Sequence, residues 1–141
     1  MWDASHFGGC RFAAAMVLLP HGVVLGDVPP ADGPGITAGY AAGLLPSRWV
    51  RGRSAFPPAV QAAQHHARSQ TGAYGVAALR PVEVGEADGI WRVAFADPEV
   101  TVVVRERRVE TGRPLTCAAT APGWMRVFDL VDVAVGEPVS P

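Results

Sequence analysis

From residue 76 onward, short apolar stretches alternate with turn-forming residues, and few folds accept such a pattern. Strands are expected at residues 76–84, 91–96, 100–107, 115–119 and 125–135. Turn residues divide them, including Gly-Glu-Ala-Asp-Gly at 85–89 and Asp-Pro-Glu at 97–99. Trp91, Val93 and Phe95 alternate with more polar or smaller residues, as in a half-buried antiparallel strand. The pattern predicts an antiparallel β meander within residues 73–135, followed by a loose tail at 136–141.

The first half predicts a β-hairpin and a weak helix. Residues 12–19 are apolar on both alternating faces, which is typical of a covered interior strand of an α/β sheet. Pro20-His21-Gly22 separates them from a second strand, so we expect a hairpin at about 12–28 with His21 solvated at its tip. A helix is expected at about 34–45, although its glycines at 35, 39 and 43 each cost about 1 kcal/mol relative to alanine. These glycines either form a flat stripe that admits another backbone or simply reflect composition.

A second helix is predicted at residues 57–71, because prolines suit its first turn and Gly72 suits its end. Its thin apolar stripe comprises Phe56, Val60, Ala63 and Ala67. We therefore expect a surface helix that buries one edge, with Gln61, His65 and Arg68 on the solvent side and His66 beside the stripe. His65 and His66 point about 100° apart and cannot easily share a metal ion. Residues 47–54 before this helix are expected to form a basic connection.

Composition and charge narrow the classes of function. The 141 residues are 49% hydrophobic and 18% charged, as in one folded globular protein rather than a disordered chain. The net charge of −1 argues against a nucleic-acid partner. No apolar run reaches the eighteen or more residues of a membrane span, so we expect a cytoplasmic protein with no membrane association. Cys10 and Cys117 are too few for a disulfide framework, although a single bridge between them stays open.

The opening loop combines a histidine and a cysteine. His6 and Cys10 flank Gly8 and Gly9, and the apolar strand-like run follows directly. Imidazole and thiolate on a glycine turn would suit a metal-holding loop. Alternatively, the glycines form an ordinary turn, His6 is solvated and Cys10 is a small buried side chain. A zinc site that uses His6, Cys10 and a distant third ligand is a further alternative.

Several separated segments resemble the sucrase/ferredoxin-like family. They are WDASHFGGCRFA at 2–13, LLPHG at 18–22, RGRS at 51–54 and PPAVQAA at 57–63. The resemblance runs from residue 2 to about 70 and continues loosely to the end. It implies an α+β protein in which residues 1–72 form the C-terminal part of a thioredoxin-like 2Fe-2S ferredoxin domain, with the β-rich part packed on it. The family loop before the hairpin often carries two cluster ligands as His-x3-His, which places ligands at His6 and Cys10 here.

The sequence departs from this family in two ways. Cysteine stands at the second loop position instead of histidine, although both residue types ligate iron-sulfur clusters. The family's upstream pair of cysteines has no counterpart, so this chain supplies two of the four ligands that a 2Fe-2S cluster needs. A misassigned start, a partner chain that provides the rest, or a remnant without a cluster would each explain this. A hairpin without its parallel neighbours would also expose an edge, so we expect self-association.

The resemblance implies one-electron transfer, with His6 and Cys10 as half of the cluster ligands and a redox partner protein. Arg11, Arg51 and Arg53 would offset cluster charge or meet an acidic partner, or else are ordinary solvated arginines. The alternative is a cluster-free binding or assembly module with a decayed metal site. The sequence shows no Gly-x-Ser-x-Gly elbow, P-loop or His-Glu-x-x-His motif, so we expect a non-catalytic carrier rather than an enzyme.

Overall fold

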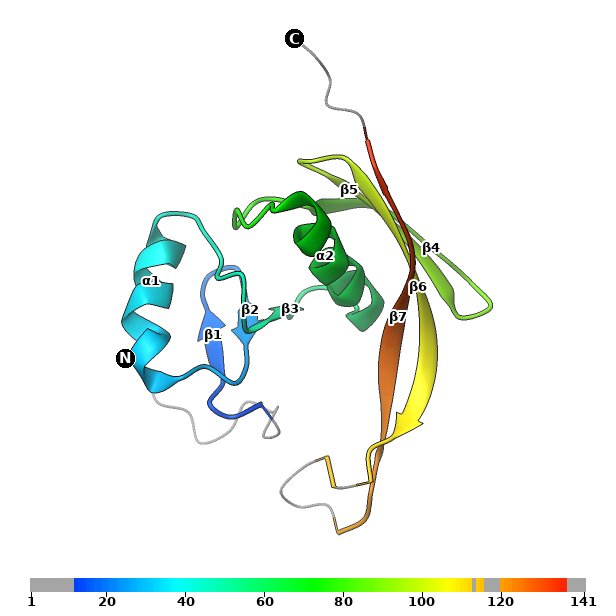
Figure 1. Cartoon of the computed structure of the whole chain (residues 1–141), viewed down its shortest axis with the longest axis horizontal. Helices are drawn as coiled ribbons and strands as arrows, with labels where there is room; N and C mark the ends of the chain where they lie inside the picture. The colour runs from blue at the N-terminus through cyan, green and yellow to red at the C-terminus, as the bar shows by residue number, and fades with distance from the viewer. Residues whose placement is uncertain (1–11, 113, 116–119, 137–141) are drawn as a thin grey trace.

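The computed structural model describes residues 12–112, 114–115 and 120–136. It confirms an α+β fold that contains an antiparallel meander (Figure 1). The elements in chain order are β1 (Met16–Leu18), β2 (Val23–Leu25), the 3-10 helix η2 (Pro30–Asp32), α1 (Gly33–Ala41), β3 (Val50–Arg53), α2 (Pro58–Thr71), β4 (Arg80–Ala87), β5 (Ile90–Ala96), β6 (Val100–Glu110) and β7 (Trp124–Val135).

The hairpin expected at about 12–28 is present as β1 and β2. The two strands pair from Met16 with Leu25 to Leu18 with Val23, and backbone hydrogen bonds extend the pairing as far as Phe12 and Val28. The expectation of a covered interior strand is wrong. β1 has three residues and lies at the edge of the sheet β1-β2-β3. Its apolar run includes Val17 and Leu19, which are 38% and 72% exposed, because no layer of described residues covers that face.

The segment expected as a basic connection contains strand β3 instead. β3 pairs antiparallel with β2, and its glycine lies opposite Val24. Gly52 has φ +141°, and a Cβ there would meet the Gln61 side chain at 2.2 Å, so this position requires glycine. The sequence did not predict β3, because its four residues, Val-Arg-Gly-Arg, show no apolar alternation.

Helix α1 is shorter than the predicted 34–45. It ends at Ala41, and Gly43, at φ +79°, turns the chain so that the Leu44 amide donates to the Gly39 carbonyl. A Cβ added at Gly35 or Gly39 would meet no described atom within 4 Å. Within the described residues, therefore, no second backbone packs against the glycine stripe.

Helix α2 confirms the predicted helix at 57–71. It spans Pro58–Thr71 and ends at Gly72, which has the left-handed φ of 68°. The expectation that it buries one edge is wrong, because it lies between the two sheets and contacts β3 as well as β5, β6 and β7 (Figure 1). Ala59, Ala63 and Ala67 are fully buried, and their small side chains allow these close contacts on both sides.

The larger sheet has the order β4-β5-β6-β7, and α2 covers one of its faces. The core between them comprises Val60, Ala63, Ala67, Leu79, Val93, Phe95, Val100, Val102 and Val104. A separate core lies between the small sheet, α1 and the adjoining loops and comprises Leu18, Val23, Leu25, Val28, Ile36, Leu45 and Val76. The α2 residues of these cores all belong to the first one, so the hydrophobic core that α2 shares with a sheet is the one with the larger sheet.

In the second half, β4 begins later than predicted, and two predicted segments fall largely outside the described residues. β4 begins at Arg80 rather than at residue 76, because Val76 joins the small core and its amide donates to the Gly43 carbonyl. Of the strand expected at 115–119, Leu115 lies in a bend, and residues 116–119 fall outside the described residues. Most of the predicted tail falls outside them too.

Nowhere in the described ranges is there a helix long and apolar enough to span a membrane.

Candidate functional site

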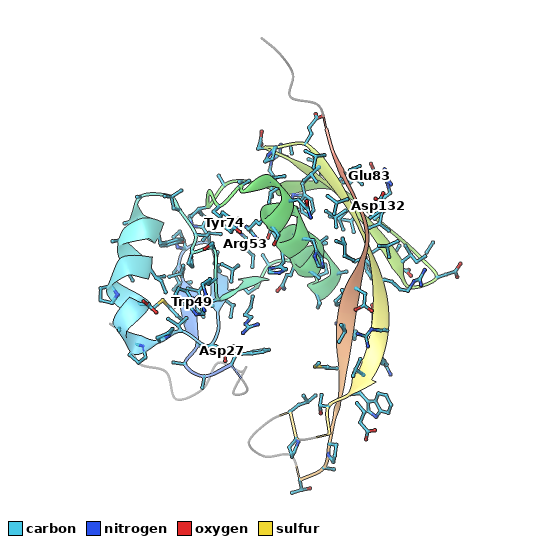
Figure 2. All side chains as sticks on the ribbon, viewed as in Figure 1. Asp27, Trp49, Arg53, Tyr74, Glu83 and Asp132 are labelled. Carbon is cyan, nitrogen blue, oxygen red and sulfur yellow. The ribbon has the colours of Figure 1, made fainter. Side chains whose placement is uncertain are left out.

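A basic hollow of about 430 Å³ opens between the small sheet and α2. We name it the arginine hollow. The loop after β2, the start of β3, the last turns of α2 and the loop that follows it supply its lining, which comprises Asp27, Pro29, Ser47, Arg48, Trp49, Val50, Arg51, His65, Arg68, Ser69 and Tyr74. Figure 2 labels three of these lining residues, Asp27, Trp49 and Tyr74. Three arginines and a single carboxylate give the lining a positive charge.

One of the three arginines is already paired. Arg51 donates a hydrogen bond to the Asp27 carboxylate, and its guanidinium carbon lies 4.3 Å from the centre of the Phe12 ring. The Asp27 amide in turn donates to the Phe12 carbonyl at 2.9 Å. Arg51 therefore ties the start of the described chain to the rim of the hollow.

Arg48 has a different environment. It is exposed, and its guanidinium lies 5.3 Å from the Trp49 ring, which is a cation–π contact. Among the described residues, Arg48 has no carboxylate within ion-pair distance. Its charge is thus free to meet a ligand at the rim.

Arg68 forms the floor of the hollow and contradicts the expectation that it is solvated. Its side chain is 4% exposed, and its buried Nε has no hydrogen-bond partner. Burial and the neighbouring charge of Arg53 lower the pKa of Arg68 to about 10, although Tyr74 opposes this shift. Within the described part of the chain, no acceptor or carboxylate satisfies this guanidinium.

Arg53 lies close to Arg68 but has a partner. One of its terminal nitrogens donates to the Val76 carbonyl, and its ring contact is with Phe56 at 5.9 Å. Its Nε is also buried without a partner. Two neighbouring arginines therefore repel each other in a partly buried place, which is unfavourable unless an anion joins them.

Trp49 forms a wall of the hollow in an unusual backbone conformation. Its φ is +67°, which is uncommon for a bulky residue. Its carbonyl accepts a hydrogen bond of 2.9 Å from the Gly26 amide, and its side chain packs on the small core. Strained conformations of this kind concentrate at functional sites, where the surrounding structure holds them.

The three described histidines do not form a metal centre. His21 is exposed at the hairpin tip, as expected, and its Nδ1 lies 2.5 Å from the Tyr40 hydroxyl. The ring centroids of His65 and His66 are 5.6 Å apart, and the ring planes meet at 69°. Burial and the adjacent His65 lower the pKa of His66. The described residues contain no group of three or more His, Cys, Asp or Glu side chains that could hold a metal ion.

The residues singled out in the opening loop, His6 and Cys10, lie outside the described residues, as do Arg11 and Cys117. Of the other arginines that we associated with a cluster, Arg51 lines the hollow, and Arg53 is close to Arg68 but does not line the hollow. Sequence reasoning missed Arg68 as a site residue. The signal was available, because Gln64 and Arg68 lie four and eight residues after Val60 and so continue its buried face.

Comparisons with known proteins identify no relative: no family model matches the chain, and no curated protein or solved structure matches it.

Proposed function

We propose that this chain is part of a 2Fe-2S electron-transfer protein of the sucrase/ferredoxin-like type, with His6 and Cys10 as half of the cluster ligands. The observation that carries the proposal is the His-x3-Cys loop placed directly ahead of a β-hairpin, with α2 packed behind the sheet. The hairpin and α2 follow the loop in the chain order that the resemblance implies, which supports the proposal. They are the part of the fold that would hold the loop.

The donor chemistry of the loop fits an iron-sulfur cluster, because thiolate and imidazole both ligate such iron. The ligand count is incomplete. The described residues offer no metal-holding group, and the sequence contains only one other cysteine, Cys117. The second pair of ligands is therefore expected from another polypeptide segment or from a second copy of this chain, since two copies together would supply four.

Residues beside the loop suit a site that carries negative charge. Phe12 follows Cys10 by two residues, and Arg51 stands over its ring. Because Arg51 also pairs with Asp27, its guanidinium would offset only part of the charge of thiolate-bound iron. The exposed Arg48 extends the positive surface, which would attract an acidic redox partner. When bound, the cluster would supply reversible one-electron transfer, and an imidazole ligand would raise its potential relative to a set of four thiolates.

Anaerobic reconstitution of the full chain with iron and sulfide tests the proposal. We expect visible charge-transfer absorption, and we expect His6→Ala and Cys10→Ala each to abolish it. His21→Ala is the matched control, because His21 is exposed at the hairpin tip and should leave the spectrum unchanged. One cluster per two chains, with a dimer in sedimentation, would show that two copies share it. A chain that gains no absorption alone or with added partner segments contradicts the proposal.

A second candidate, a binding module without a cluster, draws on one observation. The arginine hollow places the unpartnered guanidinium of Arg68 in a cavity of ligand size. This candidate expects ligand binding by the hollow whether or not iron is present. Zinc bound by His6 and Cys10 is distinguished from both candidates by metal analysis after aerobic purification.

A further inference from the structure

We propose that the arginine hollow binds a small organic phosphate monoester, with the phosphate on Arg68 and Arg48. This inference goes beyond electron transfer, because it concerns residues of the small sheet and α2 and requires no cluster.

Arg68 provides the first step of the argument. Its side chain is more than nine-tenths buried, lines the hollow and makes no hydrogen bond to any described residue. A buried charge without a partner is costly, and proteins keep such a group where a ligand completes it. The guanidinium is planar and presents paired N–H donors that match two oxygens of a phosphate.

The groups around Arg68 leave it free for a ligand. The single carboxylate in the lining, that of Asp27, is engaged by Arg51. The nearby Arg53 donates to the Val76 carbonyl and adds a second positive charge close to Arg68. The described surroundings therefore favour an anion in the hollow and offer Arg68 no competing acceptor.

The rim supplies further donors and sets the charge of the ligand. Ser47, Ser69 and Tyr74 bring hydroxyl groups to the lining, and Arg48 brings a second guanidinium without an ion-pair partner among the described residues. Two uncompensated charges, those of Arg48 and Arg68, match the dianion of a phosphate monoester better than a carboxylate. The hydroxyl groups suit its remaining oxygens.

The shape of the hollow favours an organic group on the phosphate. A volume of about 430 Å³ exceeds what a free phosphate ion fills, and it lies in the range of small-molecule sites. Trp49 and Tyr74 give two aromatic walls, and the backbone at Trp49 is held at φ +67°. We infer that these walls contact a flat or apolar group carried by the phosphate.

Calorimetric titration of the full chain at constant ionic strength tests this inference, with phenyl phosphate, inorganic phosphate and benzoate as probes. We expect phenyl phosphate to bind most tightly, inorganic phosphate more weakly, and benzoate at least tenfold more weakly than phenyl phosphate. The His6→Ala variant should bind as the parent does, which separates this result from the outcome of cluster reconstitution.

Variants locate the site. Arg68→Gln and Arg48→Gln should each weaken phenyl phosphate binding by tenfold or more. Arg48 is exposed, so its replacement keeps the test valid if Arg68→Gln fails to fold. The matched control is Arg92→Gln, an exposed arginine on β5 outside the hollow, which should change affinity less than twofold. Binding of no probe at millimolar concentration, equal binding of benzoate and phenyl phosphate, or an equal loss in the Arg92 variant would overturn the proposal.

Discussion

Replacement of Arg68 by methionine should stabilise the fold while it removes the anion site. Methionine keeps the length and apolar stem of the arginine side chain but lacks its charge. In the folded chain, burial and the charge of Arg53 lower the pKa of Arg68 to about 10, which is more than two pKa units below that of a free guanidinium. At about 1.4 kcal/mol per pKa unit, the fold disfavours the charged form by roughly 3 kcal/mol.

The pH dependence follows from the sign of this shift. A lowered pKa means that the folded chain binds the proton less tightly than the unfolded chain does. The full penalty is therefore present at any pH below about 10 and is relieved only at higher pH. Between pH 6 and 9 the guanidinium is charged in both states, so the stability difference between parent and variant should be constant over that range.

We expect Arg68→Met to raise the free energy of unfolding by about 1–3 kcal/mol, since buried charges are often replaced by hydrophobic residues at a gain. At about 3 °C per kcal/mol, the melting temperature should rise by roughly 3–9 °C. Urea denaturation measures the change, and an unaltered slope against denaturant would show that the unfolded state is unaffected.

Arg92→Met is the control, because Arg92 is exposed and its loss should alter stability by no more than about 0.5 kcal/mol. If Arg68→Met instead destabilises the chain by more than about 1 kcal/mol, the guanidinium has a structural partner. That result would refute the reasoning behind both the stability gain and the anion site.

Three further expectations follow from the described residues. Gly52→Ala should lower the free energy of unfolding by about 1–3 kcal/mol, because the added Cβ would meet Gln61 at 2.2 Å and φ is +141°. Gly85→Ala is the control. An added Cβ there meets no described atom within 4 Å, so the same urea titration should show no loss of stability. Because the pKa of His66 is lowered in the fold, the free energy of unfolding should fall as the pH drops below about 6.5, the pKa of the unfolded state. His66→Gln should reduce this loss, whereas His21→Gln should not. Equal slopes of stability against pH in the parent and the His66 variant would contradict the assignment. Exposed strand edges should produce self-association that increases with concentration, and a clean monomer in sedimentation at high concentration would count against it.

Local sequence patterns were sufficient for much of the fold. Prolines and Gly72 bracket α2, and its buried residues Val60, Ala63 and Ala67 follow the 3.6-residue period. Alternation in β5 places Val93 and Phe95 in the core. These features depend on residues near in sequence, so periodicity and turn chemistry reveal them.

Tertiary contacts account for the features that the sequence did not predict. β3 is a strand because β2 pairs with it, and nothing in its own four residues indicates this. Arg68 is buried because sheets lie on both sides of α2, whereas an arginine on a helix is normally solvated. The arginine hollow joins the loop after β2 to Arg68, about forty residues later, so no local motif marks it.

Pulsed electron paramagnetic resonance of the reduced, iron-reconstituted chain examines the ligand role of His6. If His6 binds iron, the spectrum should contain a nitrogen hyperfine coupling from its imidazole, and this coupling should disappear in His6→Cys although a cluster still forms. The coupling should persist in His21→Ala. A reduced cluster with no nitrogen coupling, or with one that survives the His6 replacement, would contradict the proposal that this loop ligates the cluster.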